Sequence, residues 1–432
     1  MTQKCTLGLP VATIFLAFAL LAGQPVLAQS DDALITRENW GAQTGFVSDL
    51  NIPGFQSGMT IDAGNVEQFK DYLPEPVLLM LRKYKLKIRT RDYAPYAPSD
   101  GYIAATNKHR GTARLVEIGD STKITGLENY HAGLPFPDPK TGREVAWNFF
   151  NSYHGDDGKH EFGVFWISAK KGVESSERWR WTLINNSMHR TDIEPIPRLE
   201  KIAKKNIAAT SITEILSPMD RKGQMALYNI YDNPVEREGW IYIPAQRRTM
   251  RFTSENHGES WNNTDLFYED IRGYSGRPEW MDWKILAKTT MLAPMCAGVK
   301  YGPEAAKETY DFENPPHWNP RLNWQPRPVY VLELTPKFKK YPYSKQILFV
   351  DAQGYYAHAK IAYDRKGQPW KLVLNATNES LDPTSKPLTI ATSLVIDLQA
   401  GHATAFPWYA YEANTGVDPN MFSLTTLRKR AR

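Results

Sequence analysis

Apolar and polar residues alternate along most of the chain, and a period of two is typical of strands with one buried face. The clearest case is residues 177–185, where Trp179, Trp181 and Leu183 fall on one face and arginine and threonine side chains fall on the other. Further strands are predicted at residues 84–89, 161–170, 224–232, 240–243, 247–253, 280–288, 329–335, 347–351, 355–363 and 370–375. We therefore expect a mainly β protein built from antiparallel strands.

Helical spacing of apolar residues is confined to short segments. Residues 65–73, 77–83 and 198–206 are predicted to form short helices before or between the strands. Residues 314–328 contain five prolines, which lack a backbone donor and disfavour strands, so this stretch is predicted to be a loop or a lid. The expected fold class is α+β, with a few helices packed against a sheet.

The first 28 residues have the pattern of an export signal. Lys4 precedes an apolar run over residues 11–21, and small residues follow as far as Ala28. This run is shorter than the roughly 20 residues that a spanning helix needs, so cleavage after Ala28 is favoured over an uncleaved anchor. The mature chain is then expected in the periplasm, free or peripheral to the outer membrane, with no integral membrane segment. Residues 29–60 are interpreted as an irregular lead-in, and residues 61–432 as a single large β domain.

The composition narrows the class of protein further. The 432 residues carry a net charge of +5, with basic and acidic residues interleaved, so nucleic acid is not an expected partner. Cys296 is the one cysteine left after signal removal, so an internal disulfide cannot form in the mature chain. The sequence contains no phosphate-binding or dinucleotide-binding glycine motif, and no cofactor is expected.

Five blocks of sequence follow one another in an order typical of a known family. They are residues 57–66 (SGMTIDAGNV), 130–137 (YHAGLPFP), 240–248 (WIYIPAQRR), 268–270 (YED) and 280–284 (WMDWK). Together they resemble domain-of-unknown-function family 1329, a family of exported proteobacterial proteins commonly labelled outer-membrane lipoprotein-sorting-like. The resemblance extends over nearly the whole mature chain.

The resemblance implies a fold like that of the carriers LolA and LolB. These have a curved, incompletely closed antiparallel β-barrel, and here helices and the proline-rich loop would pack against it. Such carriers hold acyl chains in a hydrophobic cavity and are not known as enzymes. We therefore expect a periplasmic carrier or accessory protein that binds a lipid or another hydrophobic small molecule. The protein partner that the resemblance suggests is an outer-membrane channel or an efflux-type membrane protein.

Residues 240–243 (WIYI) are apolar on both faces of a predicted strand, which indicates that both faces are covered. One cover would be the core and the other a ligand cavity, for which methionine and aromatic side chains make an adaptable lining. The same side chains would also suit an ordinary core. The residues predicted to line the cavity are Trp240, Tyr242, Met250, Phe252, Trp280 and Trp283.

Two adjacent arginines, Arg247 and Arg248, follow this strand, and acidic residues occur further along at Asp265 and Asp270. The favoured interpretation is structural ion pairing between the arginines and the acidic residues. The arginines could also receive an anionic head group or remain solvated.

The candidates for catalysis are weaker. The stretch from His154 to Glu161 (HGDDGKHE) contains metal-ligating residue types, but their spacing matches no metal motif and two glycines favour a polar hairpin turn, so no metal site is predicted. Cys296 has no nearby base and the chain has no G-x-S-x-G motif, so no catalytic residue is assigned. The alternative function is a carbohydrate-binding protein or a glycoside hydrolase that uses two carboxylates. Its stacking platforms would be Trp179, Trp181, Trp240, Trp280 and Trp283.

The mature protein is expected to begin at Gln29, because the Val-Leu-Ala ending ahead of it is one that signal peptidase accepts. N-terminal sequencing of the exported protein measures this directly. A chain that retains Met1, or one that begins at an acylated cysteine, would contradict the prediction.

Overall fold

The computed structural model describes residues 33–46, 48–235, 237–253 and 258–430. The residues from Ile35 onward form one compact unit, Ile35–Arg432, which therefore includes much of the stretch interpreted as a lead-in. The predicted signal peptide, residues 1–28, and the predicted mature start at Gln29 lie outside the described residues.

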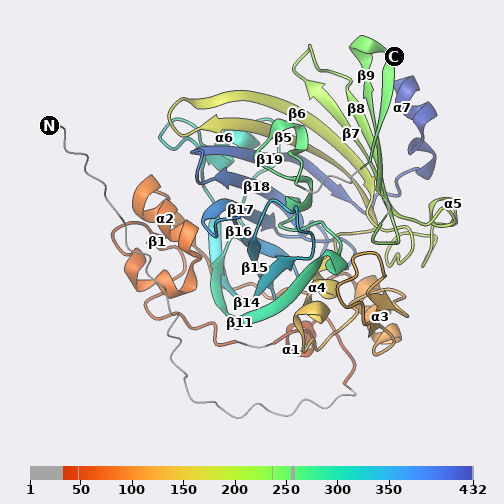
Figure 1. The fold of residues 1–432 in the computed structure, drawn as a ribbon. Coiled ribbons are helices and arrows are strands. Elements are labelled where there is room, and N and C mark those ends of the chain that lie inside the picture. The colour runs from red at the N-terminus through yellow and green to blue at the C-terminus, as the bar shows by residue number, and fades with distance from the viewer. Residues whose placement is uncertain (1–32, 47, 236, 254–257, 431–432) are drawn as a thin grey trace. The chain divides into compact units, whose positions relative to one another are not determined.

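One sheet of 15 strands dominates this unit, and most of its strands form a continuous antiparallel run (Figure 1). In spatial order the run is β11 (Met281–Ala293), β14 (Asn323–Pro336), β15 (Lys345–Asp351), β16 (Ala357–Tyr363), β17 (Pro369–Asn378), β18 (Thr389–Asp397), β19 (His402–Ala413), β5 (Asp157–Ser168), β6 (Gly172–Ile184), β7 (Ile207–Ser217), β8 (Met225–Tyr231), β9 (Arg237–Ile243) and β10 (Arg248–Thr253). Strands β1 (Thr60–Ile61) and β2 (Ile88–Thr90) join through a parallel pairing of β2 with β14. Among the described residues the antiparallel run ends at β11 and at β10, so the sheet is not closed. The prediction of a mainly β protein with an incompletely closed antiparallel sheet is confirmed.

Short helices and two small ladders complete the unit. The helices are α1 (Trp40–Gln43), α2 (Glu75–Tyr84), α3 (Asp100–His109), α4 (Gly142–Phe150), α5 (Glu200–Ala203), α6 (Ala305–Thr309) and α7 (Leu424–Arg430). Single 3₁₀ turns are η1 (Val66–Gln68), η2 (Lys70–Tyr72), η3 (Pro244–Gln246), η4 (Trp261–Asn263), η5 (Tyr268–Asp270), η6 (Pro278–Trp280) and η7 (Pro419–Met421). The ladders are β3 (Arg114–Leu115) with β4 (Leu127–Glu128), and β12 (Tyr310–Asp311) with β13 (Asn319–Pro320). Figure 1 shows α7 beside β7, β8 and β9.

The helix predictions are confirmed at α2 and α5, but the first of them needs correction. Residues 65–73 form the two 3₁₀ turns η1 and η2 in place of one α-helix. Val66 and Phe69, both buried, lie three residues apart, and a 3₁₀ turn places residues at this spacing on one side as well as an α-helix does. The predicted strand at 84–89 is shorter than expected and begins at Ile88, because α2 extends to Tyr84.

The predicted loop at residues 314–328 is wrong in its second half, because β14 begins at Asn323 and this part of the strand is mostly buried. Pro326 and Pro328 precede Val329, where pairing with β15 begins. At the two prolines β14 therefore pairs with β11 alone. At these two positions β14 has no second partner strand beside it among the described residues, so the missing proline N–H groups do not interrupt a second ladder. Prolines in sheets are found at such positions.

The two faces of the sheet carry different cores. We call the face with Trp179, Val373 and Phe406 the inner face, and these side chains belong to an aromatic-rich cluster. On the outer face, Leu372 and Leu394 belong to a second cluster that includes the buried side of α2. The alternation seen in the sequence thus separates two cores on a sheet that is covered on both faces.

Residues 258–277, which we call the crossing segment, run over the inner face. Trp261 packs against Trp179 of β6 and Phe406 of β19, with ring centroids 5.0 and 6.0 Å apart. Further along the segment, the Asp265 side chain bonds to β19, and Asp270 bonds to β16. The segment therefore contacts strands that lie on both sides of β19 in the sheet.

A buried ion pair holds the crossing segment to the sheet. The Lys360 ammonium of β16 donates to the Asp270 carboxylate, and neither side chain has any exposed surface. The Tyr343 hydroxyl donates to the same carboxylate at 2.7 Å, and Lys360 Nζ also donates to Gln346 Oε1 at 3.1 Å. Burial lowers the pKa of Lys360, and the neighbouring Asp270 charge opposes this shift. The additional hydrogen bonds satisfy the groups that burial removes from water.

Replacing Lys360 with methionine leaves the Asp270 carboxylate buried without its cation, so we expect the free energy of unfolding to fall by about 3–5 kcal/mol. Asp270→Asn should cost a similar amount, and the double variant should lose clearly less than the sum of the two. Denaturant titration followed by tryptophan fluorescence measures all three values. Arg82→Gln, which removes an exposed pair with Glu67, is the control and should cost at most about 1 kcal/mol. Additive losses in the double variant would contradict the pairing.

Candidate ligand-binding cavity

A cavity of about 600 Å³ lies against the inner face of β6, β7 and β8. The crossing segment forms the opposite wall, and the end of α4 with residues 151–156 forms a third side. The volume lies within the roughly 300–1,000 Å³ that is usual for small-molecule sites. The cavity is therefore large enough to hold a ligand.

Helix α4 positions part of this wall. It begins with a capping box, in which Thr141 Oγ1 accepts from the Glu144 backbone N–H at 3.2 Å and the Glu144 carboxylate accepts from the Thr141 N–H at 2.8 Å. The two reciprocal bonds satisfy donors that a helix start otherwise leaves free. From this fixed start, the helix carries Trp147, Phe149 and Phe150 to the cavity.

The lining is mainly apolar and rich in aromatic rings. In β6, the period of two places Trp181 and Leu183 on the inner face, as the sequence pattern predicts. The other large apolar side chains of the lining are Leu127, Trp147, Phe149, Phe150, Phe162, Ile184, Ile230, Trp261, Leu266, Ile271, Ile390, Phe406 and Trp408. Such a surface favours ligands with apolar parts.

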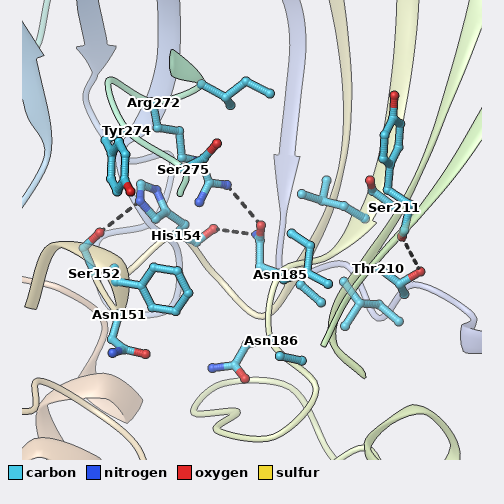
Figure 2. A pocket seen from close by; sticks show the side chains of 18 of the residues that line it. Asn151, Ser152, His154, Asn185, Asn186, Thr210, Ser211, Arg272, Tyr274 and Ser275 are labelled. Atoms are coloured by element: carbon cyan, nitrogen blue, oxygen red, sulfur yellow. Dashed lines mark hydrogen bonds between the residues drawn. The ribbon is translucent and has the colours of Figure 1, made fainter. Parts of the chain in front are cut away.

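At one end the cavity becomes polar. Figure 2 shows that Ser152, His154, Asn185 and Arg272 gather there. Ser152 Oγ and His154 Nε2 are 3.0 Å apart, and Asn185 Nδ2 donates to the His154 backbone oxygen at 3.2 Å. Arg272 Nη2 donates to Asn185 Oδ1 at 3.1 Å. A few directional groups thus stand beside a large apolar surface, as in sites that orient an amphiphilic ligand.

Burial dominates the electrostatics of this end. Desolvation lowers the pKa of His154 well below its usual value and that of His160 to about 3, and the Arg272 charge adds to both shifts. Both imidazoles are therefore neutral at physiological pH. Desolvation also lowers the pKa of Arg272 itself.

Asp156 is buried beside the same end and has a structural role. Its carboxylate accepts backbone N–H bonds from Thr191, Asp192 and Ile193 at 2.7 to 3.1 Å. Burial raises the pKa of Asp156 to about 6, in opposition to these bonds and to the charge of Arg190. The bonds fix the loop after β6 against the residues that precede β5.

The structure places Trp240 and Tyr242 on the outer face of β9, where they pack with α7 and do not line the cavity. The register gives the reason. Trp240 is opposite Leu227, whereas Gly239 is opposite Tyr228, and this second pair lines the cavity. Both faces of β9 are covered, as the sequence indicates, but the predicted lining lies on the face that the C-terminal helix covers.

The other predicted lining residues also lie away from the cavity. Met250 of β10 is 38% exposed and is not part of the lining. The side chain of Phe252 lies outside the described part of the structure. Trp280 and Trp283 are buried in the core, and their indole N–H groups donate to backbone oxygens at 3.0 and 2.8 Å. These two tryptophans support the fold beside the crossing segment.

Arg247 and Arg248 are exposed at the start of β10, and neither has an acidic partner among the described side chains. Asp265 instead bonds to side chains of β19, and Asp270 pairs with Lys360. The structure therefore does not show the predicted pairing of Arg248 with Asp270, because Asp270 pairs with Lys360. Asp270 lies fully buried under the inner face, whereas Arg248 is exposed on a strand at the end of the sheet.

The stretch from His154 to Glu161 leads into β5 and is not the predicted hairpin turn. His160 stacks on Tyr411 with ring centroids 4.1 Å apart, and Glu161 pairs with Arg178 at 2.6 Å. In the part of the chain that the structure describes, no group of three or more His, Cys, Asp or Glu side chains could hold a metal ion.

Sequence reasoning does not assign Asn185, Arg272 or the crossing segment to the site. The signal that could have found Arg272 is its setting in residues 267–274 (FYEDIRGY), where an arginine followed by glycine lies among aromatic and acidic residues. That setting predicts a turn near a core, but it gives no indication of which strands the turn contacts.

These features define a mainly β protein with an open sheet and an internal, ligand-sized cavity. The model of the family described as Protein of unknown function (DUF1329) matches residues 60–428, and the chain belongs to this family. The uncharacterized protein PA3922 of Pseudomonas aeruginosa is 21% identical over 461 residues, covering 96% of each chain.

Solved structures show remote likenesses over 66% of this chain. A domain from Vibrio parahaemolyticus, provisionally described as an outer membrane lipoprotein-sorting protein domain, is 20% identical, with a TM-score of 0.47 and 98% of that chain covered. A DUF1329 family protein from Desulfovibrio piger is 17% identical, with a TM-score of 0.46 and 97% covered. The LolA superfamily protein NE2245 from Nitrosomonas europaea is 13% identical, with a TM-score of 0.40 and 99% covered.

The attachment of the crossing segment to β19 should depend on pH. His402 Nδ1 lies 2.7 Å from Asp265 Oδ2, and this hydrogen bond is the largest cause of a raised pKa at His402. Because the folded pKa exceeds the unfolded value of about 6.5, the stabilisation is fully present below about pH 6.5 and is lost as the pH rises through the folded pKa. We expect the difference in unfolding free energy between the unmodified protein and His402→Gln to shrink between about pH 6 and pH 9. Denaturant titrations across this range measure it, and a constant difference would contradict the assignment.

Proposed function

We propose that this protein is a non-enzymatic carrier or accessory protein that binds a lipid or another hydrophobic molecule in the cavity on its inner face. The observation that carries the proposal is the cavity itself, with its volume of about 600 Å³ and its aromatic-rich lining. A space of this size lined by apolar side chains is the default binding site of a protein.

Burial of apolar surface supplies the binding energy in this proposal. Each methylene that leaves water for an apolar wall contributes about 0.8 kcal/mol. Rings such as Phe162, Trp181 and Phe406 offer broad contact to a chain of variable shape. The polar end with Asn185 and Arg272 would orient the ligand, and no covalent step is required.

The alternative, a carbohydrate-binding protein or a glycoside hydrolase, has less support. Trp179, Trp280 and Trp283, which it would use as stacking platforms, are buried in packed core. Two of the carboxylates that line the cavity, Asp156 and Asp270, are engaged in buried hydrogen bonds, so these two are not free to act as an acid or a base.

We place this carrier in the periplasm, working with an outer-membrane channel or an efflux-type membrane protein. The apolar N-terminal segment, with its small-residue ending at Ala28, supports export. None of the described helices is long and apolar enough to cross a membrane. Native mass spectrometry of the protein purified from its own periplasm tests the proposal, because a carrier should retain a hydrophobic ligand.

A cavity-filling substitution tests the site. Ser211 of β7 lines the cavity, so Ser211→Trp should occupy part of the space and weaken binding of the neutral probe N-phenyl-1-naphthylamine by about tenfold or more. Because the new ring enters existing space, the free energy of unfolding should change by less than about 1 kcal/mol. Fluorescence titration and denaturant titration measure the two quantities.

Met250→Trp is the matched control, because Met250 is an exposed residue of the same sheet outside the cavity. The control should bind the probe as tightly as the unmodified protein does. If the unmodified protein fails to bind the probe, or if Ser211→Trp binds it equally well, the cavity is not a hydrophobic binding site.

A further inference from the structure

Three arginine side chains line the cavity, and they differ in their partners. Arg277 pairs with Glu279 at 2.9 Å. Arg237 lies near Glu269, whose charge favours the charged form of Arg237. Arg272 has no carboxylate within ion-pair distance in the described ranges of the chain. Of the three, it is the cation without a protein counter-ion.

The contacts of Arg272 leave most of its guanidinium available. Its one described hydrogen bond runs from Nη2 to Asn185 Oδ1 at 3.1 Å. Asn185 is itself held by a backbone bond to Asp156 and by its side-chain bond to His154. The neighbouring His154 is held neutral by burial and by the Arg272 charge, which both lower its pKa, so it adds no second cation to this end of the cavity. Leaving a cation unpaired in such a place costs several kcal/mol, so the position favours an anion that comes from outside the chain.

The local backbone holds Arg272 firmly in place. Arg272 has a φ of 59°, in the left-handed region that side chains other than glycine rarely adopt, and Gly273 follows with a φ of 92°. A Cβ atom on Gly273 would lie 2.8 Å from the Cβ of Ala357 in β16, so the turn presses closely on the sheet. Asp270, which forms the buried pair with Lys360, lies two residues before Arg272 in the chain. The same anchor that fixes the crossing segment therefore fixes the arginine.

We propose that Arg272 binds the anionic head group, a carboxylate or a phosphate monoester, of an amphiphile whose apolar chain occupies the cavity. The inference rests on the proposed function and adds the class of ligand to it. A guanidinium presents two parallel donors to a pair of oxygens, which a carboxylate and a phosphate both offer. The aromatic walls next to this end would take the chain, so head and tail would be recognised at the same time.

Ligands of equal chain length and different head group test the inference. Displacement of N-phenyl-1-naphthylamine would be measured with palmitate, hexadecyl phosphate and uncharged hexadecanol, and with acetate and inorganic phosphate as chainless controls. We expect the charged chains to bind about tenfold more tightly than hexadecanol, or more, because a charge-assisted hydrogen bond is lost with the neutral head. The two chainless anions should not displace the probe, and the stronger of the two charged chains identifies the head group.

Arg272→Gln should bind palmitate and hexadecyl phosphate as weakly as hexadecanol, while hexadecanol binding stays unchanged. Arg272→Lys keeps the charge and should retain part of the preference. Arg248→Gln removes the same charge from an exposed position outside the cavity and should retain all of it. Circular dichroism and denaturant midpoints check that each variant is folded.

The outcomes separate the two proposals. Equal binding of charged and neutral chains by the unmodified protein overturns the head-group inference and leaves the hydrophobic cavity in place. A preference that survives in Arg272→Gln overturns it as well. If no chain binds the unmodified protein, both the inference and the proposed function fail. The comparison in the unmodified protein needs no variant, so an unfolded Arg272→Gln would not prevent a decision.

Discussion

The ion pair between Asp270 and Lys360 is the constraint on which the cavity depends. The crossing segment is mostly irregular, so few backbone ladder bonds hold it to the sheet. Two opposite charges taken together out of water supply a strong and directional attachment, provided that further hydrogen bonds satisfy both ions, as Tyr343 and Gln346 do here. Without this attachment the cavity would lose the wall that faces β6, β7 and β8.

The inner face is filled unequally, and the crossing segment accounts for the difference. Near β19, Trp261 and Leu266 enter an aromatic cluster and complete an ordinary core. Toward β7 and β8 the same segment leaves the cavity between itself and the strands, although the Tyr268 hydroxyl lies 3.1 Å from the Tyr228 hydroxyl of β8. Small or polar side chains on β7, such as Ala209 and Ser211, leave that space open. The crossing segment thus packs directly on one part of the inner face and forms a wall of the cavity over the other part.

Several strands could be predicted from the sequence because one of their faces is polar, although β7 is not among them. Trp181 and Leu183 are the clearest example, because the arginines that alternate with them identify the wet face. Strands β18 and β19 are absent from the predicted set, since both are buried for most of their length and show no regular alternation.

The site was harder to predict because it depends on contacts that are remote in sequence. The two faces of residues 240–243 look alike in the sequence, and α7, nearly 200 residues later, decides which of them is outer. The bond from Thr404 to Asp265 likewise spans 139 positions. Arg272 lies in an irregular segment with no periodic pattern of apolar residues. It stands out because it lacks a carboxylate partner in the described structure, and the sequence alone does not reveal this.

An open sheet has two ends that could recruit a further strand, and the charges on them bear on self-association. Strand β10 carries exposed Arg248 at one end of the antiparallel run, whereas its Arg251 pairs with Glu238, and β11 carries exposed Lys284 and Lys288 at the other end. If two copies met edge to edge, cations would be brought together along the new ladder, and that repulsion disfavours continuous sheets across molecules. Arg248, one of the two arginines that first suggested a head-group site, therefore has a simpler consequence: a cation at the edge of an unclosed sheet opposes pairing with the same edge of a second copy.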